Sequence, residues 1–147
     1  MTALAPTSGE LRGKFHVFPV RVYYEDTDAG GIVYHANYLR FAERARTEML
    51  RIIGIEQSKL AGEVGLMFAV YKGDVHYAKP ARLDDTLMVE TSLTGLGAAS
   101  LKIRQVISRA ADELVRFNAE VACLDRTGKP ARLPEHLKKT LMTYVTA

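Results

Sequence analysis

The sequence predicts an α+β domain in which an antiparallel sheet curls around one long helix. Between residues 35 and 53, apolar side chains recur at steps of three and four, as on one face of an amphipathic helix. In the second half of the chain, apolar and polar side chains alternate with a period of two, which is typical of strands with one buried face. Strands grouped around a single helix and joined by short turns indicate an antiparallel sheet.

The first strand is expected at residues 15–24, which are rich in aromatic and β-branched side chains. Pro19 lies within it and predicts an edge or a bend, because proline cannot donate to a neighbouring strand. The long helix follows and ends before Gly54. Two alanines in the middle of its apolar stripe, Ala42 and Ala45, would let a sheet approach the helix closely.

Four more strands and a terminal helix complete the domain. A strand is expected at residues 66–77, and alternating side chains predict strands at residues 86–93, 101–108 and 115–123. Pro134 suits the first turn of a helix that buries Leu137, Leu141 and Tyr144. The central helix would be roughly 28 Å long at 1.5 Å per residue, and strands of roughly 33–40 Å would match it. Five strands are therefore expected to wrap around one helix, with residues 1–13 as a disordered lead-in and 14–147 as one domain.

Composition excludes several classes of function. A net charge of +3, with 20 basic residues spread along the chain, is too weak and diffuse to indicate a nucleic-acid partner. No stretch approaches the roughly 20 apolar residues of a membrane span, and the N-terminus lacks a signal-peptide pattern. Cys123 is the only cysteine, so no intrachain disulfide can form. These observations predict a cytoplasmic protein. One helix covers only one face of the sheet, so we also expect a homo-oligomer.

Residues 25–38, EDTDAGGIVYHANY, concentrate acidic residues and glycines just before the helix. As a calcium loop the stretch fails, because its fifth position is Gly30 and its twelfth is Asn37, where acidic ligands are required. As a phosphate cradle it lacks the Lys-Ser/Thr pair after the glycines. No metal is therefore expected.

A catalytic turn at the start of the helix remains. The glycines would allow close approach of a ligand to the main chain, and unpaired N–H groups at a helix start can bind a developing oxyanion. Asp28 could then attack an acyl carbon or activate water, while His35 could orient substrate or relay a proton. Equally open from the residues alone, Asp26 or Asp28 is an ordinary turn or N-cap residue, and His35 is a structural side chain.

The stretch RVYYEDTDAGGIVYHANYLRFAERAR at residues 21–46 closely resembles the signature of hotdog-fold acyl-CoA thioesterases of the 4-hydroxybenzoyl-CoA thioesterase superfamily. Within it, the sequence is most similar to the YbgC-type branch, which is associated with the Tol-Pal system. HYAKPARLDDTLMVET at residues 76–91 also resembles the segment that joins two strands in this family. The resemblance covers nearly the whole chain from Phe15.

The resemblance implies a hotdog fold and hydrolysis of an acyl-CoA thioester to a free acid and CoA, without a cofactor. It implies that Asp28 is the catalytic carboxylate, either as a nucleophile that forms a mixed anhydride or as a general base. The oxyanion site would lie at Gly31 and at the main chain near Tyr34 and His35. Histidine at position 35 agrees with the YbgC-type branch, whereas the founding member of the superfamily, which acts on an aromatic acyl group, has tyrosine there.

Partners and alternatives follow from the same resemblance. Lys79 and Arg82 are candidate partners for the phosphates of CoA, and each site would form between two subunits of a homodimer or homotetramer. An acyl carrier protein could replace CoA as the carrier. The alternative function is a non-catalytic acyl-CoA or acyl-carrier-protein binding module. A hotdog dehydratase is disfavoured, because its His/Asp or His/Glu pair belongs to a different helix motif.

Overall fold

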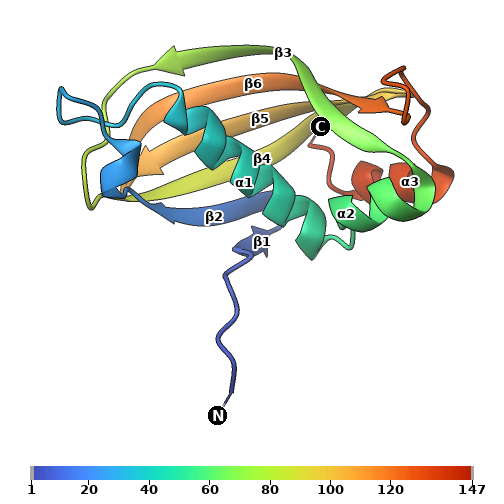
Figure 1. Ribbon diagram of the computed structural model, residues 1–147, viewed down its shortest axis with the longest axis horizontal. Helices are drawn as coiled ribbons and strands as arrows, with labels where there is room; N and C mark the ends of the chain where they lie inside the picture. Colours follow the sequence, from blue (N-terminus) through green and yellow to red (C-terminus); the bar gives the residue numbers. More distant parts are fainter. Residues whose placement is uncertain (1, 147) are drawn as a thin grey trace.

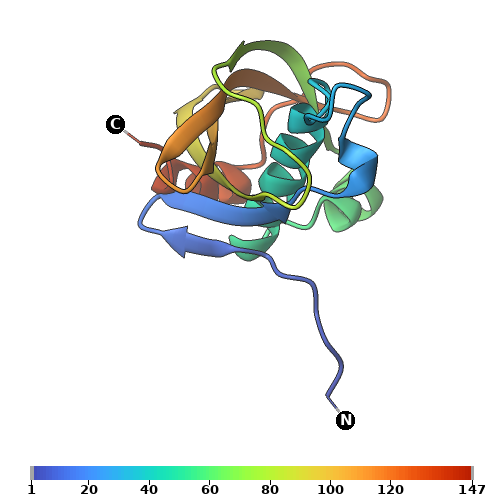
Figure 2. The same cartoon turned by 90° about the vertical axis from the view of Figure 1, so that its left-hand side faces the viewer.

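The computed structural model describes residues 2–146, and its strands wrap around one long helix (Figure 1, Figure 2). Six antiparallel strands form one sheet in the order β1-β2-β4-β5-β6-β3. The strands are β1 (Glu10–Arg12), β2 (Phe15–Arg21), β3 (Met67–Tyr77), β4 (Thr86–Leu96), β5 (Ser100–Arg109) and β6 (Asp112–Leu124). The helical elements are α1 (Asn37–Ile52), α2 (Gln57–Lys59), α3 (Glu135–Thr143) and the single turns η1 (Tyr24–Asp26) and η2 (Leu60–Val64). Among residues 2–146, no helix is long and apolar enough to cross a membrane.

Helix α1 packs against the concave face of the sheet, as its apolar stripe predicts (Figure 2). Phe41, Ala42 and Ala45 on this stripe have no exposed surface. The two alanines were expected to let the sheet approach the helix closely. The sheet does so at Ala42, whose carbonyl oxygen accepts a hydrogen bond of 2.8 Å from Gln105 Nε2 on β5. The predicted architecture, a sheet wrapped around one central helix, is therefore confirmed.

The prediction of five strands is wrong by one, and the additional strand, β1, lies within the segment 1–13 for which no structure was expected. The fully buried side chain of His16 on β2 helps to hold the segment before β1 against the sheet. Its Nε2 lies 2.7 Å from the Ser8 carbonyl oxygen, and the Ser8 hydroxyl donates to Glu48 of α1 at 2.9 Å. The exposed N-terminal end of the described chain runs away from the body (Figure 1).

The beginning of the domain differs from the prediction in two boundaries. Strand β2 ends at Arg21 rather than at residue 24, because the chain turns into η1. Helix α1 begins at Asn37, two residues later than expected. Pro19 is tolerated in β2 because β1 pairs only as far as Val17, so Pro19 has no strand beside it on that side.

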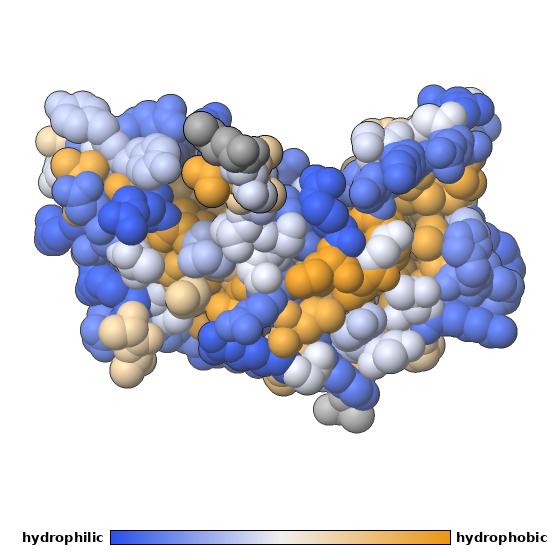
Figure 3. Space-filling model, turned by 90° about the horizontal axis from the view of Figure 1, so that it is seen from below, coloured by the Kyte–Doolittle hydropathy of each residue, from blue (hydrophilic) through white to orange (hydrophobic). Residues whose placement is uncertain are grey.

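Strand β3 is an open edge, because β6 is its only partner strand within residues 2–146. Four large apolar or aromatic side chains on its eleven residues remain exposed: Met67 (51%), Val70 (44%), Tyr71 (59%) and Tyr77 (44%). Seen from below, hydrophobic side chains also reach the surface in a band across the middle of the molecule (Figure 3). One chain by itself thus leaves a long strand edge and apolar surface uncovered.

Candidate active site

The chain between η1 and α1 forms a tight turn that presents Asp28 to solvent. Thr27 and Val33 bridge its two sides. The Asp28 N–H donates to the Ile32 carbonyl at 2.9 Å, and the Gly31 N–H donates back to the Asp28 carbonyl at 3.0 Å. Gly31 has a φ of +79°, a left-handed conformation that favours glycine. The glycine at this position is therefore required by the turn itself.

The two aspartates of this stretch have different environments. Asp26 is 5% exposed, and its carboxylate accepts hydrogen bonds of 2.8 Å from the Tyr23 N–H and from Asn37 Nδ2. Asp28 is exposed, and only its Oδ1 has a partner among residues 2–146, the Gly30 N–H at 2.8 Å. Asp26 thus ties the start of α1 to the turn before it, whereas Asp28 keeps a free carboxylate oxygen.

Of the backbone N–H groups expected at the oxyanion site, those of Gly31 and Tyr34 are occupied within the described chain. The Tyr34 N–H donates to the Asp26 carbonyl at 2.9 Å, so it is not available to a ligand, and the Gly31 N–H is also occupied. Within the described chain, the N–H groups of His35 and Ala36 donate to no protein oxygen. These two groups precede the first residue of α1, where the helix dipole adds partial positive charge.

Hydrogen bonds to the neighbouring carbonyls fix the direction of these free N–H groups. The Asn37 N–H donates to the Tyr34 carbonyl at 2.8 Å, and the Tyr77 hydroxyl of β3 donates to the His35 carbonyl at 3.0 Å. Because the N–H and C=O of a trans peptide point in opposite directions, each bond also orients the N–H of the same peptide. Tyr77 belongs to the site although nothing near residue 28 in the sequence indicated it.

The imidazole of His35 is exposed and lies among aromatic rings. Its centroid is 4.6 Å from that of Tyr34 and 6.3 Å from that of Tyr77, the latter edge to face. In residues 2–146, the His35 ring makes no hydrogen bond to another side chain, so it is not linked to Asp28 within one chain. No cluster of His, Cys, Asp or Glu in the described part of the chain could hold a metal ion.

The connection between β3 and β4 supports the turn from the side. The Val33 N–H donates to the Ala81 carbonyl, and the Ala81 N–H donates to the Tyr38 hydroxyl, both at 2.9 Å. Burial is the main cause that raises the pKa of Tyr38, although the hydrogen bond from Ala81 opposes it. The turn and the first part of α1 are therefore held against the same connection.

An ion pair keeps this connection in place. Arg109 Nη1 lies 2.7 Å from Asp85 Oδ2, which also accepts the Arg82 N–H at 2.8 Å. Partial burial would raise the pKa of the Asp85 carboxyl, but the hydrogen bonds from Arg82 and Arg109, with their charges, outweigh it and lower that pKa. The β3–β4 connection is therefore ordered where it meets the turn.

The two residues expected to contact CoA both lie on the same connection. Arg82 is exposed and pairs through its backbone with Ile32 of the turn. Its guanidinium has no ion-pair partner in the chain from 2 to 146, whereas Lys79 Nζ is 3.0 Å from Asp112 Oδ1. Arg82 is thus the cation placed beside the turn with its charge available.

Comparison with known proteins identifies the family. A family model described as the Thioesterase superfamily matches residues 30–116. The acyl-CoA thioesterase YbgC of Haemophilus influenzae is 47% identical over 122 residues, covering 82% of this chain and 90% of the relative. The acyl-CoA thioester hydrolase YbgC of Escherichia coli O6:H1 is 49% identical over 123 residues, with the same coverage of 82% and 90%.

Solved structures agree with the fold. The crystal structure of a probable thioesterase from Bartonella henselae is 40% identical and has a TM-score of 0.79, covering 82% of this chain and 99% of that one. A hypothetical protein from Aquifex aeolicus is 29% identical with a TM-score of 0.80, covering 85% and 98%. The fold, the family match and the identities agree over most of the chain, which therefore belongs to the Thioesterase superfamily as a hotdog thioesterase of the YbgC type.

Proposed function

We propose that this protein hydrolyses acyl-CoA thioesters to a free carboxylic acid and CoA, with Asp28 as the working carboxylate. One observation carries the assignment. An exposed carboxylate with a free oxygen lies on the turn that leads into α1, and that turn ends in two unpaired backbone N–H groups. A thioester needs a nucleophile or activated water at its carbonyl carbon and hydrogen-bond donors at its carbonyl oxygen. The acyl-CoA activity in the names of the two YbgC relatives supports this substrate class.

The N–H groups of His35 and Ala36 would bind the thioester oxygen as negative charge develops on it. Hydrogen bonds to the Tyr34 and His35 carbonyls already orient the two peptides that carry these N–H groups, so little reorganisation is needed during the reaction. The partial positive charge at the start of α1 acts in the same direction. When the tetrahedral intermediate collapses, the carbon–sulfur bond breaks and CoA leaves as a thiolate.

Asp28 has two possible roles in the attack. As a nucleophile, its free oxygen bonds to the acyl carbon and forms a mixed anhydride, which water then hydrolyses. As a general base, it takes a proton from the water that attacks the thioester. The hydrogen bond from Gly30 to Oδ1 leaves the other oxygen free for either role. His35 orients the substrate or relays a proton from the same turn.

Arg82, with Lys79 beside it, is proposed to bind the phosphates of CoA. The Arg82 guanidinium is exposed and free of protein carboxylates among residues 2–146, so its charge is available to an anion. Lys79 would first have to leave Asp112. An acyl carrier protein could present the same phosphopantetheine thioester.

A hydrolysis screen tests the proposed activity. Short, long, branched and aromatic acyl-CoAs and an acyl carrier protein thioester would be assayed by release of the free thiol. We expect at least one substrate to reach a kcat/KM of about 10⁴ M⁻¹s⁻¹, the lower end of ordinary enzyme values. A protein that binds acyl-CoA but hydrolyses none of the panel would instead be a binding module.

We also propose that the working form is a homodimer or homotetramer, acting in the cytoplasm. The eleven-residue edge of β3 exposes unpaired backbone groups and four large apolar or aromatic side chains, which a second copy would cover by extending the sheet. The apolar band on the face seen from below offers a further contact for a tetramer (Figure 3). Tyr77 lies on this edge and contacts His35, so assembly and the site are close together.

Tyr71→Lys tests this assembly. Tyr71 is 59% exposed on β3, and in a two-fold symmetric edge the same residue of each copy lies near the contact, so two added lysines would repel. We expect sedimentation velocity to shift towards the monomer, with hydrolysis falling as the monomer fraction rises. Met142→Lys, at a similarly exposed apolar side chain on α3, is the matched control. A Tyr71→Lys protein that stays fully oligomeric would contradict the role of β3.

A further inference from the structure

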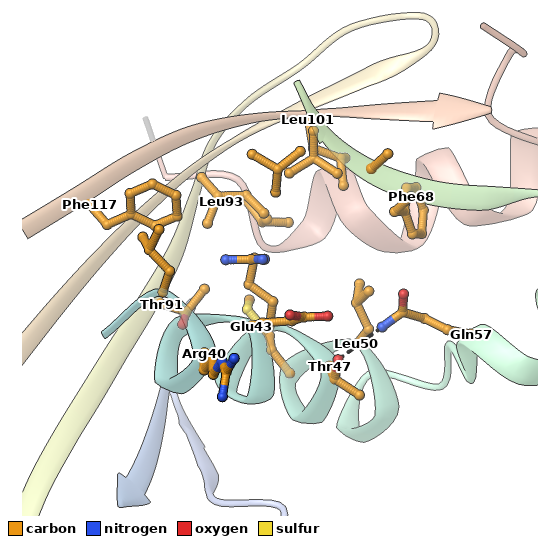
Figure 4. A pocket seen from close by; sticks show the side chains of 17 residues that line it. Arg40, Glu43, Thr47, Leu50, Gln57, Phe68, Thr91, Leu93, Leu101 and Phe117 are labelled. Atoms are coloured by element: carbon orange, nitrogen blue, oxygen red, sulfur yellow. Dashed lines mark hydrogen bonds between the residues drawn. The ribbon is translucent and has the colours of Figure 1, made fainter. Parts of the chain in front are cut away.

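A cavity of about 420 Å³ lies between α1 and the sheet (Figure 4). Most of its wall is apolar, and the main apolar contributors are Leu39, Met49, Leu50, Phe68, Leu93 and Leu101. Leu39 and Arg40 line it from the first turn of α1, three and four residues after Ala36. The cavity therefore begins one turn of helix after the free N–H groups of His35 and Ala36 and continues along α1.

Arg46 lines the same cavity and is held by a buried amide. Its Nη1 donates to Gln105 Oε1 at 3.0 Å. Gln105 has no exposed surface, and its Nε2 donates to the Ala42 carbonyl at 2.8 Å and to Thr91 Oγ1 at 3.0 Å. Because both ends of the amide are occupied, Gln105 is fixed, and so is the guanidinium it binds. The Arg46 Cζ also lies 5.9 Å from the centre of the Phe117 ring.

The charge of Arg46 lacks a close anionic partner within the described chain, since no carboxylate oxygen lies within ion-pair distance. Burial lowers the pKa of Arg46, and the charge of Glu43, on the same cavity, only partly offsets this. An arginine keeps its proton even so. A cation in a mainly apolar cavity is stabilised by a ligand that supplies an acceptor or a negative charge.

The position of Arg46 sets a length for such a ligand. Gln105 binds both the Ala42 carbonyl and the Arg46 guanidinium, so the guanidinium lies near the level of Ala42, seven residues after His35. Seven residues of α-helix rise roughly 10 Å. An extended chain covers about 1.2 Å per bond, one third of the ~3.6 Å spanned by the three backbone bonds of a residue. A chain of roughly eight bonds would therefore reach from the reaction centre to Arg46.

We propose that this cavity binds the acyl group of the substrate and that Arg46 selects acyl chains of medium length that carry a carboxylate, or another oxygen acceptor, at the far end. This inference rests on the proposed thioesterase function and adds the class of acyl group to it. The apolar wall binds the methylene chain, and the fixed guanidinium binds the terminal oxygen. Arg46 acts on substrate choice and takes no part in breaking the thioester.

A comparison of two substrates tests the selection. Octanedioyl-CoA and octanoyl-CoA have the same length and differ only in the terminal carboxylate, so their ratio of kcat/KM cancels any change in CoA binding. We expect wild-type protein to prefer octanedioyl-CoA by about tenfold or more, the scale of one charge-assisted hydrogen bond. Arg46→Met should reverse this preference, and Arg46→Lys should retain part of it. Arg44→Met, at an exposed arginine of α1 that does not line this cavity, is the matched control and should keep the wild-type ratio.

The outcomes separate this inference from the proposed function. Propionyl-CoA is too short to reach Arg46, so unchanged propionyl-CoA hydrolysis shows that Arg46→Met has a folded, active site. If wild-type and Arg46→Met proteins give the same octanedioyl-to-octanoyl ratio, the selection by Arg46 is wrong and the thioesterase function stands. If the wild type hydrolyses neither these three nor any substrate of the wider screen, the proposed function fails. The inference is then decided separately by calorimetry. The affinities for octanedioyl-CoA and octanoyl-CoA are compared, and a preference for octanedioyl-CoA in the wild type that Arg46→Met loses supports selection by Arg46, whereas equal ratios contradict it.

Discussion

Asp28→Asn will greatly reduce hydrolysis while leaving the fold and its ligand affinity intact. The substitution removes the negative charge and the basicity on which both proposed roles depend, so we expect kcat to fall by about 10²–10⁴-fold or more. The turn should survive, because the asparagine carbonyl can still accept the hydrogen bond that the Gly30 N–H makes to Asp28 Oδ1. Steady-state kinetics on the best substrate of the hydrolysis screen measures the effect.

The control for Asp28→Asn is a measurement of binding and stability on the same protein. Calorimetry should give an affinity for acyl-CoA close to that of the wild type, and the midpoint of thermal unfolding should not move, because Asp28 is exposed. A variant that keeps wild-type kcat would rule out Asp28 as the working carboxylate. Single-turnover hydrolysis by the wild type in H₂¹⁸O tests whether Asp28 acts as a nucleophile, since ¹⁸O incorporated into Asp28 indicates the mixed anhydride.

Asp26→Ala, in contrast to Asp28→Asn, will cause a large loss of folding stability. The substitution leaves two donors without their acceptor in a buried place, the Tyr23 N–H and Asn37 Nδ2. Each buried group left without a partner costs about 1–3 kcal/mol, so we expect the free energy of unfolding to fall by about 2–4 kcal/mol. Urea denaturation measures it. Glu25→Ala, at the exposed neighbour, should change stability by less than about 0.5 kcal/mol.

A double-mutant cycle isolates the contact between Asp26 and Asn37. Because the two side chains are joined at 2.8 Å, their individual losses of stability should not add, and Asp26→Ala with Asn37→Ala should cost clearly less than the sum. Folded Asp26→Ala should also have a lower kcat, since loss of the carboxylate bonds to Tyr23 and Asn37 loosens the segment whose backbone carbonyl accepts the Tyr34 N–H next to the free donors. Strictly additive losses would mean that the two residues act independently.

Local sequence patterns were sufficient for the architecture. The period of two predicted the strands β4, β5 and β6, and the period of three to four predicted α1, because burial of one face imposes those periods on any sequence. The alanines predicted the close approach of the sheet, which Gln105 uses to reach Ala42. The motif at residues 25–38 also located the turn, and its resemblance to the thioesterase signature is what pointed to Asp28.

The separation of roles within the motif depended on residues far away in the sequence. Asp26 and Asp28 look alike in sequence, and only the contact of Asp26 with Asn37, eleven residues later, shows which one is structural. Likewise, β1 is held by His16 and by Glu48, forty residues from Ser8. The hydroxyl of Tyr77, forty-two residues from His35, orients a peptide of the site. None of these contacts has a local periodicity that could reveal it.

The sequence by itself thus determined the α+β class, the central helix, the later strands and the position of the candidate turn. The tertiary structure decided which aspartate is free, which N–H groups are unpaired, that a sixth strand exists, and that Arg46 lies in an apolar cavity. The physical reason is the range of the interactions. Periodic burial is repeated at every turn or every second residue and is visible in a short window, whereas the partner of a single polar group is set by where distant segments meet.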